Sequence, residues 1–208
     1  GADQNLFQCA PTQVCWNAGA TDADNNISSV QLVSGVGSFN GSQICFTPST
    51  TGTYTFILEA TDACGATDRD TCVINITLNT PPVADAGADQ SFFQCTPAPI
   101  CLPASCSDID GNLVGCDLIS GNGTYSNGNI CFTPSGGGSY TFIIEASDAC
   151  GATDRDTVLV NVSLNDSPTI AFGNDTSLFL CQPQPVCLDY TVSDPQGMNK
   201  LVETMVSG

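Results

Sequence analysis

One opening segment of this chain occurs three times at a constant spacing, and this repetition restricts the fold more than any other feature. Phe7-Gln8-Cys9 returns as Phe93-Gln94-Cys95 and again as Phe179-Leu180-Cys181, with a shift of 86 residues each time. The run at 62–70 returns unchanged at 148–156 with the same shift. A chain that repeats itself in this way without a gap is an array of similar domains.

The repetition divides the 208 residues into three sections, which we name the first, second and third repeats. The first repeat spans 1–86, the second spans 87–172, and the third, 173–208, matches only the opening of the others. We therefore expect the sequence to be a section of a longer array. The third repeat lacks a match to 44–78, so we expect further sequence of the array or another chain to complete it, because half a sandwich leaves strand edges open.

Short runs of β-branched and aromatic residues, bounded by turn residues, fill each repeat, and no helical periodicity is present. In the first repeat they predict seven strands, near 5–9, 14–20, 29–33, 37–39, 43–47, 53–62 and 68–78. Seven short strands are typical of an immunoglobulin-like β-sandwich. The predicted fold class is all-β, with tandem immunoglobulin-like β-sandwich repeats at an 86-residue period. Trp16 is replaced by Leu102 and Leu188, so we expect it to pack in a core.

The charge balance excludes several classes of partner. Three Lys and Arg residues stand against 21 Asp and Glu residues, and the net charge of −18 would repel nucleic acid and anionic lipid. No apolar run approaches the roughly 20 residues that a membrane-spanning helix needs, so we expect no direct membrane insertion. The chain has no histidine, no nucleophile elbow and no phosphate loop. We therefore predict that it is not an enzyme.

Thirteen cysteines without any histidine favour disulfides over zinc sites. Disulfides form in oxidising compartments, so we expect an extracellular or cell-surface location. The candidate disulfide cysteines are Cys9, Cys15, Cys45, Cys64, Cys95, Cys101, Cys106, Cys116, Cys131, Cys150, Cys181 and Cys187.

The predicted strand ends sort the repeated cysteines into two groups. Cys9, Cys15 and Cys45 lie at one end of the first repeat, and Cys64 follows a long strand that ends about 20–30 Å away, at about 3.3 Å per residue. A disulfide needs Cα atoms within about 7 Å. We therefore expect Cys64 and its equivalent to pair with the preceding repeat, as in a Cys9–Cys150 bond. A local Cys64–Cys72 bond and a free thiol are the alternatives.

Cys106 and Cys116 flank a loop of the second repeat and have no equivalents in the first. We expect them to pair with each other across the two sheets.

Acidic and amide side chains recur in two predicted loops. Both loops lie at the end of the sandwich where the preceding repeat joins. Carboxylate and amide oxygens are the ligands that Ca²⁺ prefers, so the pattern predicts calcium as a cofactor. The alternative is that these residues form Asx turns that fix the loop backbones. The candidate ligands are Asp22, Asp24, Asn26, Asp62 and Asp68, their equivalents Asp108, Asp110, Asn112, Asp148 and Asp154, and Asn79 in the linker.

Three segments of the second repeat carry a resemblance to a known family: Pro-Val-Ala-Asp-Ala-Gly-Ala-Asp-Gln at 82–90, Ser-Asp-Ile-Asp-Gly-Asn at 107–112, and the strand pair within 138–162. They resemble the PKD, HYR and cadherin-like immunoglobulin-like repeats of large prokaryotic cell-surface proteins. The resemblance implies spacer, stalk or binding functions, and cadherin-like repeats bind calcium at the joining end. Such repeats often have few cysteines, so the resemblance implies a disulfide-hardened variant.

Two functions are compatible with these features. The first is a structural unit of an extracellular filament or cell-surface stalk, in which repeats stack end to end and associate with one another. The second is an adhesin module that binds carbohydrate or a partner through its loop tips. The segments that differ least between the repeats, 62–71 and 44–49, are predicted to connect repeats and to form the sandwich itself. This favours the structural function.

Overall fold

The computed structural model describes residues 2–175 and 177–197, and all of its regular elements are strands. The predicted all-β fold is therefore confirmed. Residues 198–208 of the third repeat lie outside the described residues, and so do the predictions that concern them.

The chain divides into two compact units, and neither unit is continuous in sequence. Unit 1 comprises Gly1–Pro82 together with two loops of the second repeat, Ser107–Val114 and Ser147–Thr153. Unit 2 comprises Val83–Cys106, Gly115–Ala146 and Asp154–Gly208. The units thus differ from the sections at 1–86, 87–172 and 173–208, because the two loops contact the first repeat and its linker.

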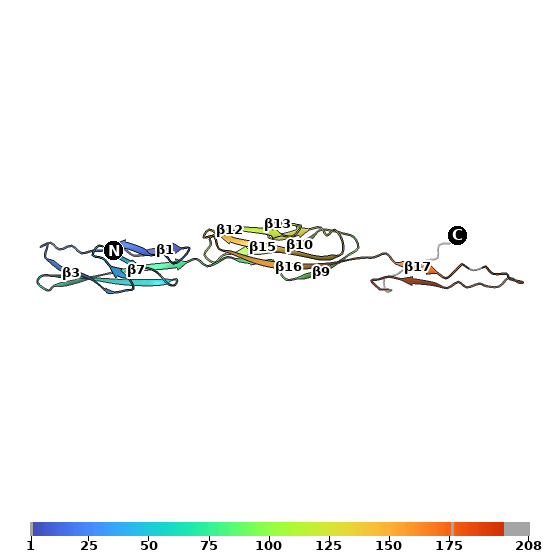
Figure 1. Cartoon of the computed structure of the whole chain (residues 1–208), viewed down its shortest axis with the longest axis horizontal. Helices are drawn as coiled ribbons and strands as arrows, with labels where there is room; N and C mark the ends of the chain where they lie inside the picture. Colours follow the sequence, from blue (N-terminus) through green and yellow to red (C-terminus); the bar gives the residue numbers. More distant parts are fainter. Residues whose placement is uncertain (1, 176, 198–208) are drawn as a thin grey trace. The chain divides into compact units, whose positions relative to one another are not determined.

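The first repeat folds into two sheets, with strand orders β1-β7-β6-β3 and β2-β5-β4. β1 runs parallel to β7, and the other pairs are antiparallel. All seven predicted strands are present, but the second ends at Asn17 and the third begins at Ile27. The strands, some labelled in Figure 1, are β1 (Gln4–Gln8), β2 (Val14–Asn17), β3 (Ile27–Ser34), β4 (Ser38–Phe39), β5 (Gln43–Phe46), β6 (Gly52–Asp62) and β7 (Thr67–Leu78).

The core of the first repeat lies between these sheets, because alternate side chains of a strand point to the same face. Phe56 on β6 and Ile74 and Ile76 on β7 are fully buried. Trp16 on β2 stacks against Phe56 with ring centroids 4.6 Å apart, which confirms its predicted core position. Burying each of these large side chains contributes roughly 1.5–3 kcal/mol to stability.

The second repeat has the same architecture, with sheets β12-β15-β16-β9 and β10-β14-β13 and an added two-stranded sheet, β11-β8. β9 runs parallel to β16, as β1 does to β7. Phe142, Ile144 and Val160 are buried in its core. The strands are β8 (Val83–Asp85), which precedes 87–172 in sequence but pairs with β11, and β9 (Gln90–Gln94), β10 (Ile100–Pro103), β11 (Ser105–Ser107), β12 (Leu113–Ser120), β13 (Thr124–Ser126), β14 (Asn129–Phe132), β15 (Gly138–Asp148) and β16 (Thr153–Leu164).

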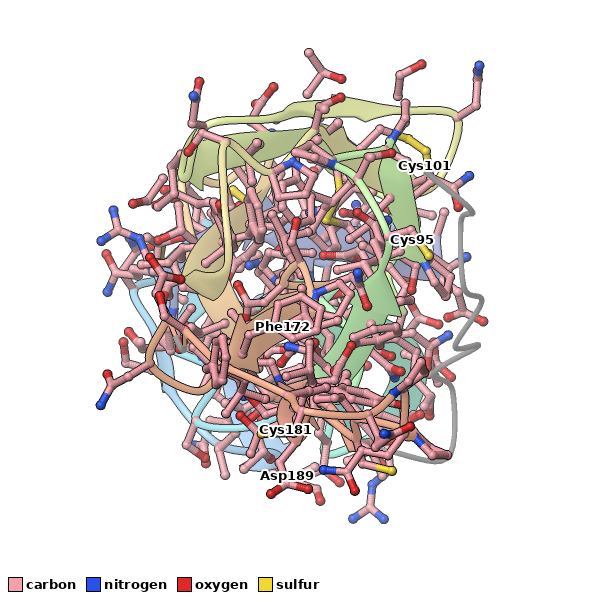
Figure 2. The ribbon with its side chains drawn as sticks, turned by 90° about the vertical axis from the view of Figure 1, so that its right-hand side faces the viewer. Cys95, Cys101, Phe172, Cys181 and Asp189 are labelled. Atoms are coloured by element: carbon pink, nitrogen blue, oxygen red, sulfur yellow. A yellow bond between two sulfur atoms is a disulfide. The ribbon has the colours of Figure 1, made fainter. Side chains whose placement is uncertain are left out.

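At the end of the second repeat and in the described part of the third, β17 (Thr169–Phe172) and β18 (Tyr190–Ser193) form one antiparallel ladder. Ile170 is 63% exposed and Phe172 is 67% exposed, and Phe172 is labelled in Figure 2. The equivalent residues 86 positions earlier, Ala84 and Ala86, are buried. The opening strands alone therefore leave the would-be core positions of this repeat in solvent.

Candidate functional site

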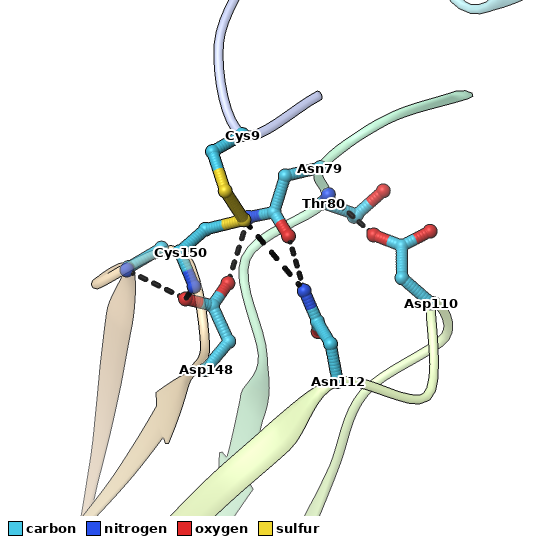
Figure 3. Close-up of a disulfide and its surroundings, with 8 residues drawn as sticks. Cys9, Asn79, Thr80, Asp110, Asn112, Asp148 and Cys150 are labelled. Carbon is cyan, nitrogen blue, oxygen red and sulfur yellow. Dashed lines mark hydrogen bonds between the residues drawn. A yellow bond between two sulfur atoms is a disulfide. The ribbon is translucent and has the colours of Figure 1, made fainter. Parts of the chain in front are cut away.

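A disulfide between Cys9 and Cys150 defines the candidate site (Figure 3). Cys9 follows β1 in the first repeat, and Cys150 lies in the turn between β15 and β16 of the second. Their Cα atoms are 5.2 Å apart, and 141 positions separate them in sequence. This is the pair that the strand lengths predicted. Closing a loop of this length restricts the unfolded chain by roughly 5 kcal/mol in the chain-entropy account.

The linker after β7 is hydrogen bonded to the same loops. Asn79 Nδ2 donates to Asp148 Oδ2 at 2.7 Å, and the Thr80 backbone N–H donates to Asp110 Oδ2 at 2.6 Å. The Asn112 amide lies 2.7 Å from Asn79 Oδ1, as Figure 3 shows. We call Cys9, the linker residues Asn79 and Thr80, and the loops Ser107–Val114 and Ser147–Thr153 the junction. All of it belongs to unit 1.

Asp148 is the central acceptor of the junction and is 3% exposed. Its Oδ1 accepts the backbone N–H groups of Cys150 at 2.9 Å and Ala152 at 2.8 Å. The hydrogen bond from Asn79 is the largest cause of a lowered pKa for this carboxyl, and it outweighs the opposing effect of burial. Asp148 is therefore held as a carboxylate, which both shapes the turn that carries Cys150 and holds the linker.

Two acidic residues that follow the turn also bind the linker backbone. Asp154 Oδ2 accepts the Ala84 N–H at 3.0 Å, and Asp156 Oδ2 accepts the Ala86 N–H at 2.8 Å. Asp154 belongs to unit 2, whereas Asp148 belongs to unit 1. Sequence reasoning missed the role of Asp156, although this residue ends the run that the two repeats share.

The Asx turns that were the alternative to calcium are present in both repeats. Asp22 Oδ1 accepts the Asp24 N–H and Asp108 Oδ1 accepts the Asp110 N–H, both at 2.7 Å. Asp62 Oδ1 accepts the Cys64 N–H at 2.8 Å, as Asp148 does for Cys150.

The described residues contain no group of three or more acidic, Cys or His side chains that could hold a metal ion. Protein N–H groups occupy one oxygen each of Asp108 and Asp110 and both oxygens of Asp148. Asp68 and Asn26, two further predicted ligands, belong to the first repeat. The junction as it stands is a hydrogen-bonded joint, and calcium binding stays a prediction.

Three further disulfides lie within the repeats. Cys15 on β2 bonds Cys45, which lies opposite it on β5, and Cys101 bonds Cys131 in the same way. Sequence reasoning placed Cys15 and Cys45 at one end of the sandwich without pairing them. The equal spacing of this pair in both repeats was the available signal. Cys106 and Cys116 bond each other as predicted, from strands β11 and β12 of different sheets.

Four candidate disulfide cysteines, Cys64, Cys95, Cys181 and Cys187, are exposed free thiols in this structure (Cys95 and Cys181 in Figure 2). The 86-residue shift of the bonded pairs gives no partner position for these four cysteines within residues 1–208. The alternative local bond of Cys64 with Cys72 is absent, and Cys72 is a buried core residue whose burial raises its pKa.

Comparisons with known proteins support the fold. The extracellular cadherin domains 1–4 of protocadherin Gamma B7 align with a TM-score of 0.55 and 16% identity, over 92% of this chain and 57% of that one. The protocadherin GammaB4 extracellular domain aligns with a TM-score of 0.57 and 14% identity, over 92% of this chain and 37% of that one. This chain thus spans less than two thirds of either structure, and identities this low show the fold alone.

No family model and no curated protein matches the sequence. Within the described residues, none of the elements is a helix of the length and apolarity that crossing a membrane requires. What the comparisons establish is an immunoglobulin-like β-sandwich chain that is similar in fold to cadherin extracellular domains.

Proposed function

We propose that this chain is a structural section of an extracellular filament or cell-surface stalk, built from disulfide-hardened repeats that stack end to end. The observation that carries the proposal is the Cys9–Cys150 bond, a second covalent connection between consecutive repeats besides the polypeptide itself. A flexible spacer between independent binding domains gains nothing from such a bond, whereas a load-bearing array does.

The linker chemistry supports a stiff joint. Thr80, Ala84 and Ala86 each donate a backbone N–H to a carboxylate of the second repeat. Between Thr80 and Ala84, Pro81 and Pro82 restrict the backbone and have no N–H groups. A linker held at this many points differs from the polar, Gly-rich and Ser-rich segments that make flexible tethers.

The remaining features agree with a structural, non-enzymatic role outside the cell. The disulfides need an oxidising compartment, and the solved structures of similar fold are extracellular domains. The sequence resemblance to PKD and HYR repeats favours a large prokaryotic surface protein as the source of the array. Self-association of repeats is part of this proposal.

Electron microscopy of the assembled protein from its source tests the proposal. We expect long, uniform fibres or stalks that keep their shape in buffer without reductant and become flexible in reductant. Separate compact particles, or arrays that are equally flexible with and without reductant, would contradict a structural role for the junction.

The second candidate function is adhesion, and one side chain favours it. Ile109, in the loop Ser107–Val114, is 85% exposed. Single exposed apolar residues are common on protein surfaces, so a binding experiment must decide whether Ile109 contacts a partner. Binding of the chain to cells or glycan arrays that is lost in Ile109→Ser would favour this function. Unchanged binding would exclude Ile109 as the contact, and absence of binding would favour the structural function.

Calcium binding has its own test. If Asp108 and Asp110 bind Ca²⁺, the melting temperature is higher in calcium than in EDTA, and Asp108→Asn removes the difference. Asp22→Asn is the matched control, because Asp22 occupies the equivalent position in the first repeat. Equal melting temperatures in the two buffers would leave the hydrogen-bonded joint as the function of these residues.

A further inference from the structure

The loops of the first repeat have the same local structure as the loops that form the junction in the second. Asp62 Oδ1 accepts the N–H groups of Cys64 and Ala66, both at 2.8 Å, as Asp148 accepts those of Cys150 and Ala152. The Ala63 N–H donates to the Asn26 carbonyl at 2.9 Å, and the equivalent Ala149 N–H donates to Asn112 at the same distance. The first repeat therefore already contains folded loops like those that hold the linker in the junction. We call these loops, 22–26 and 62–66, its receiving half.

Several groups of this receiving half lack the partners that their equivalents have. Cys64 is an exposed free thiol, whereas the equivalent Cys150 is bonded to Cys9. Asn26 Oδ1 is buried without a hydrogen-bond partner, whereas the amide of the equivalent Asn112 lies against Asn79. A buried polar atom without a partner costs roughly 1–3 kcal/mol, so this loop is better satisfied when a neighbour docks on it.

The chain enters the first repeat along the same path as it enters the second. The Val73 N–H donates to Asp3 Oδ1 at 2.9 Å, and the Leu159 N–H donates to Asp89 Oδ1 at 2.8 Å. Asp3 and Asp89 occupy equivalent positions, and both follow a Gly-Ala pair. A linker like 79–86 could therefore lead into the first repeat as it leads into the second.

From these features we infer that Asp24, Asn26, Asp62 and Cys64 bind a preceding repeat of the same kind at the end that carries its Phe-x-Cys loop. Cys64 forms a disulfide with the cysteine after that repeat's first strand. The inference rests on the proposed function, because it extends the observed Cys9–Cys150 disulfide to a series of equivalent bonds between consecutive repeats. The occupant is defined by its chemistry: a Phe-x-Cys loop and an Asn-Thr linker, as in Phe7–Cys9 and Asn79-Thr80.

Forming the bond is an oxidation of two thiols. The two sulfurs join and release two protons and two electrons, which an exchangeable disulfide such as oxidised glutathione accepts as it is reduced to two thiols. The exposure of Cys64 allows this exchange, whereas Cys72 is buried and its pKa is raised by burial.

The experiment adds a copy of residues 1–86 in front of the complete chain, so that the first repeat gains a predecessor with a known linker. The protein is refolded in a glutathione redox buffer, digested without reduction and analysed by mass spectrometry. We expect a peptide that links Cys9 of the added copy to Cys64 of the original first repeat, together with the Cys9–Cys150 peptide. Cys64 of the unextended chain is expected to react with iodoacetamide, and Cys64 behind the added copy is expected to be protected until reduction.

The Cys9–Cys150 peptide separates the possible failures. If that peptide forms while Cys64 behind the added copy stays alkylatable or bonds Cys72, the inference is wrong and the proposed function stands. If neither the Cys9–Cys150 bond nor the bond from the added copy to Cys64 forms, the proposed function fails as well. Cys64→Ser in the extended chain is the matched variant: it should lose only the new linked peptide and leave Cys9 of the added copy alkylatable.

Discussion

Two turns of this molecule have identical sequences and different states. The run at 62–70 and the run at 148–156 are the same, yet Cys64 is a free thiol and Cys150 is bonded to Cys9. Asp62 is partly exposed, whereas Asp148 is buried and accepts a hydrogen bond from Asn79. The difference shows that the neighbouring linker and loop, not the turn's own sequence, decide whether such a turn forms a joint.

The largest expected effect on stability comes from removing the Cys9–Cys150 disulfide, in comparison with removing the free thiol of Cys64. We expect Cys150→Ser to lower the free energy of unfolding by about 2–5 kcal/mol, because the bond closes a long loop of the unfolded chain. Cys64→Ser should change it little, because that thiol is unpaired. Urea unfolding without reductant measures both free energies, and Cys9→Ser is a second variant that removes the same disulfide. Equal losses from Cys150→Ser and Cys64→Ser would contradict the comparison.

The next prediction concerns acid. The pKa of Asp148 is lowered in the folded protein, chiefly by Asn79, so the folded state prefers the carboxylate. A group with a lowered folded pKa contributes stability above its unfolded pKa, near 3.9, and this stability is lost as the pH falls through the folded pKa. We expect Asp148→Asn to be less stable than the natural chain at neutral pH and to lose less stability on acidification below about pH 4.

Asp62→Asn is the control for this pH series, because Asp62 has the same turn but no linker amide on it. Thermal melting of both variants from neutral to acid pH measures the difference. A pH dependence of Asp148→Asn that is parallel to that of the natural chain would show that Asp148 does not hold the junction through its charge.

A smaller effect is expected for the linker amide. Asn79 donates to the Asp148 carboxylate, and Asn165, its equivalent, donates instead to the adjacent Asp166 carbonyl at 2.9 Å. Asn79→Ala should therefore cost about 1.5–3 kcal/mol, the range for hydrogen bonds to charged groups, and Asn165→Ala should cost less. Urea unfolding of the two variants makes the comparison, and a greater loss from Asn165→Ala would contradict it.

Much of this organisation could be predicted from the sequence, since it follows from local rules. Alternating apolar residues fixed β6 and β7, and the length of β6 separated Cys64 from Cys9 by too great a distance for a bond. The pairing of Cys15 with Cys45 depends on β2 lying beside β5, which is a property of the whole sheet. Neither turn's sequence could reveal that only Asp148 is covered, because the two turns are identical.

The third repeat illustrates the same limit from the side of packing. Leu188 is 69% exposed, whereas Leu102, its equivalent, is 4% exposed. An apolar residue at a core position predicts burial only where the strands that cover it are present. Cys187 is likewise an exposed thiol, whereas its equivalent Cys101 is bonded to Cys131 on β14.

The smallest prediction tests whether the two repeats differ only at the junction. Arg69 contacts Glu59 and Arg155 contacts Glu145, each with a distance of 2.6 Å between Nε and Oε2. Both arginine side chains are 64% exposed, so solvent and salt screen the pairs, and each pair contributes about 0.2–1 kcal/mol. Because each pair joins neighbouring strands of its own repeat, we expect Arg69→Ala and Arg155→Ala to cost the same within about 0.5 kcal/mol and to cost less in high salt. Urea unfolding in low and high salt measures this equality. A clearly larger loss for Arg155→Ala would mean that the influence of the junction extends along β15 and β16, beyond the turn that carries Cys150.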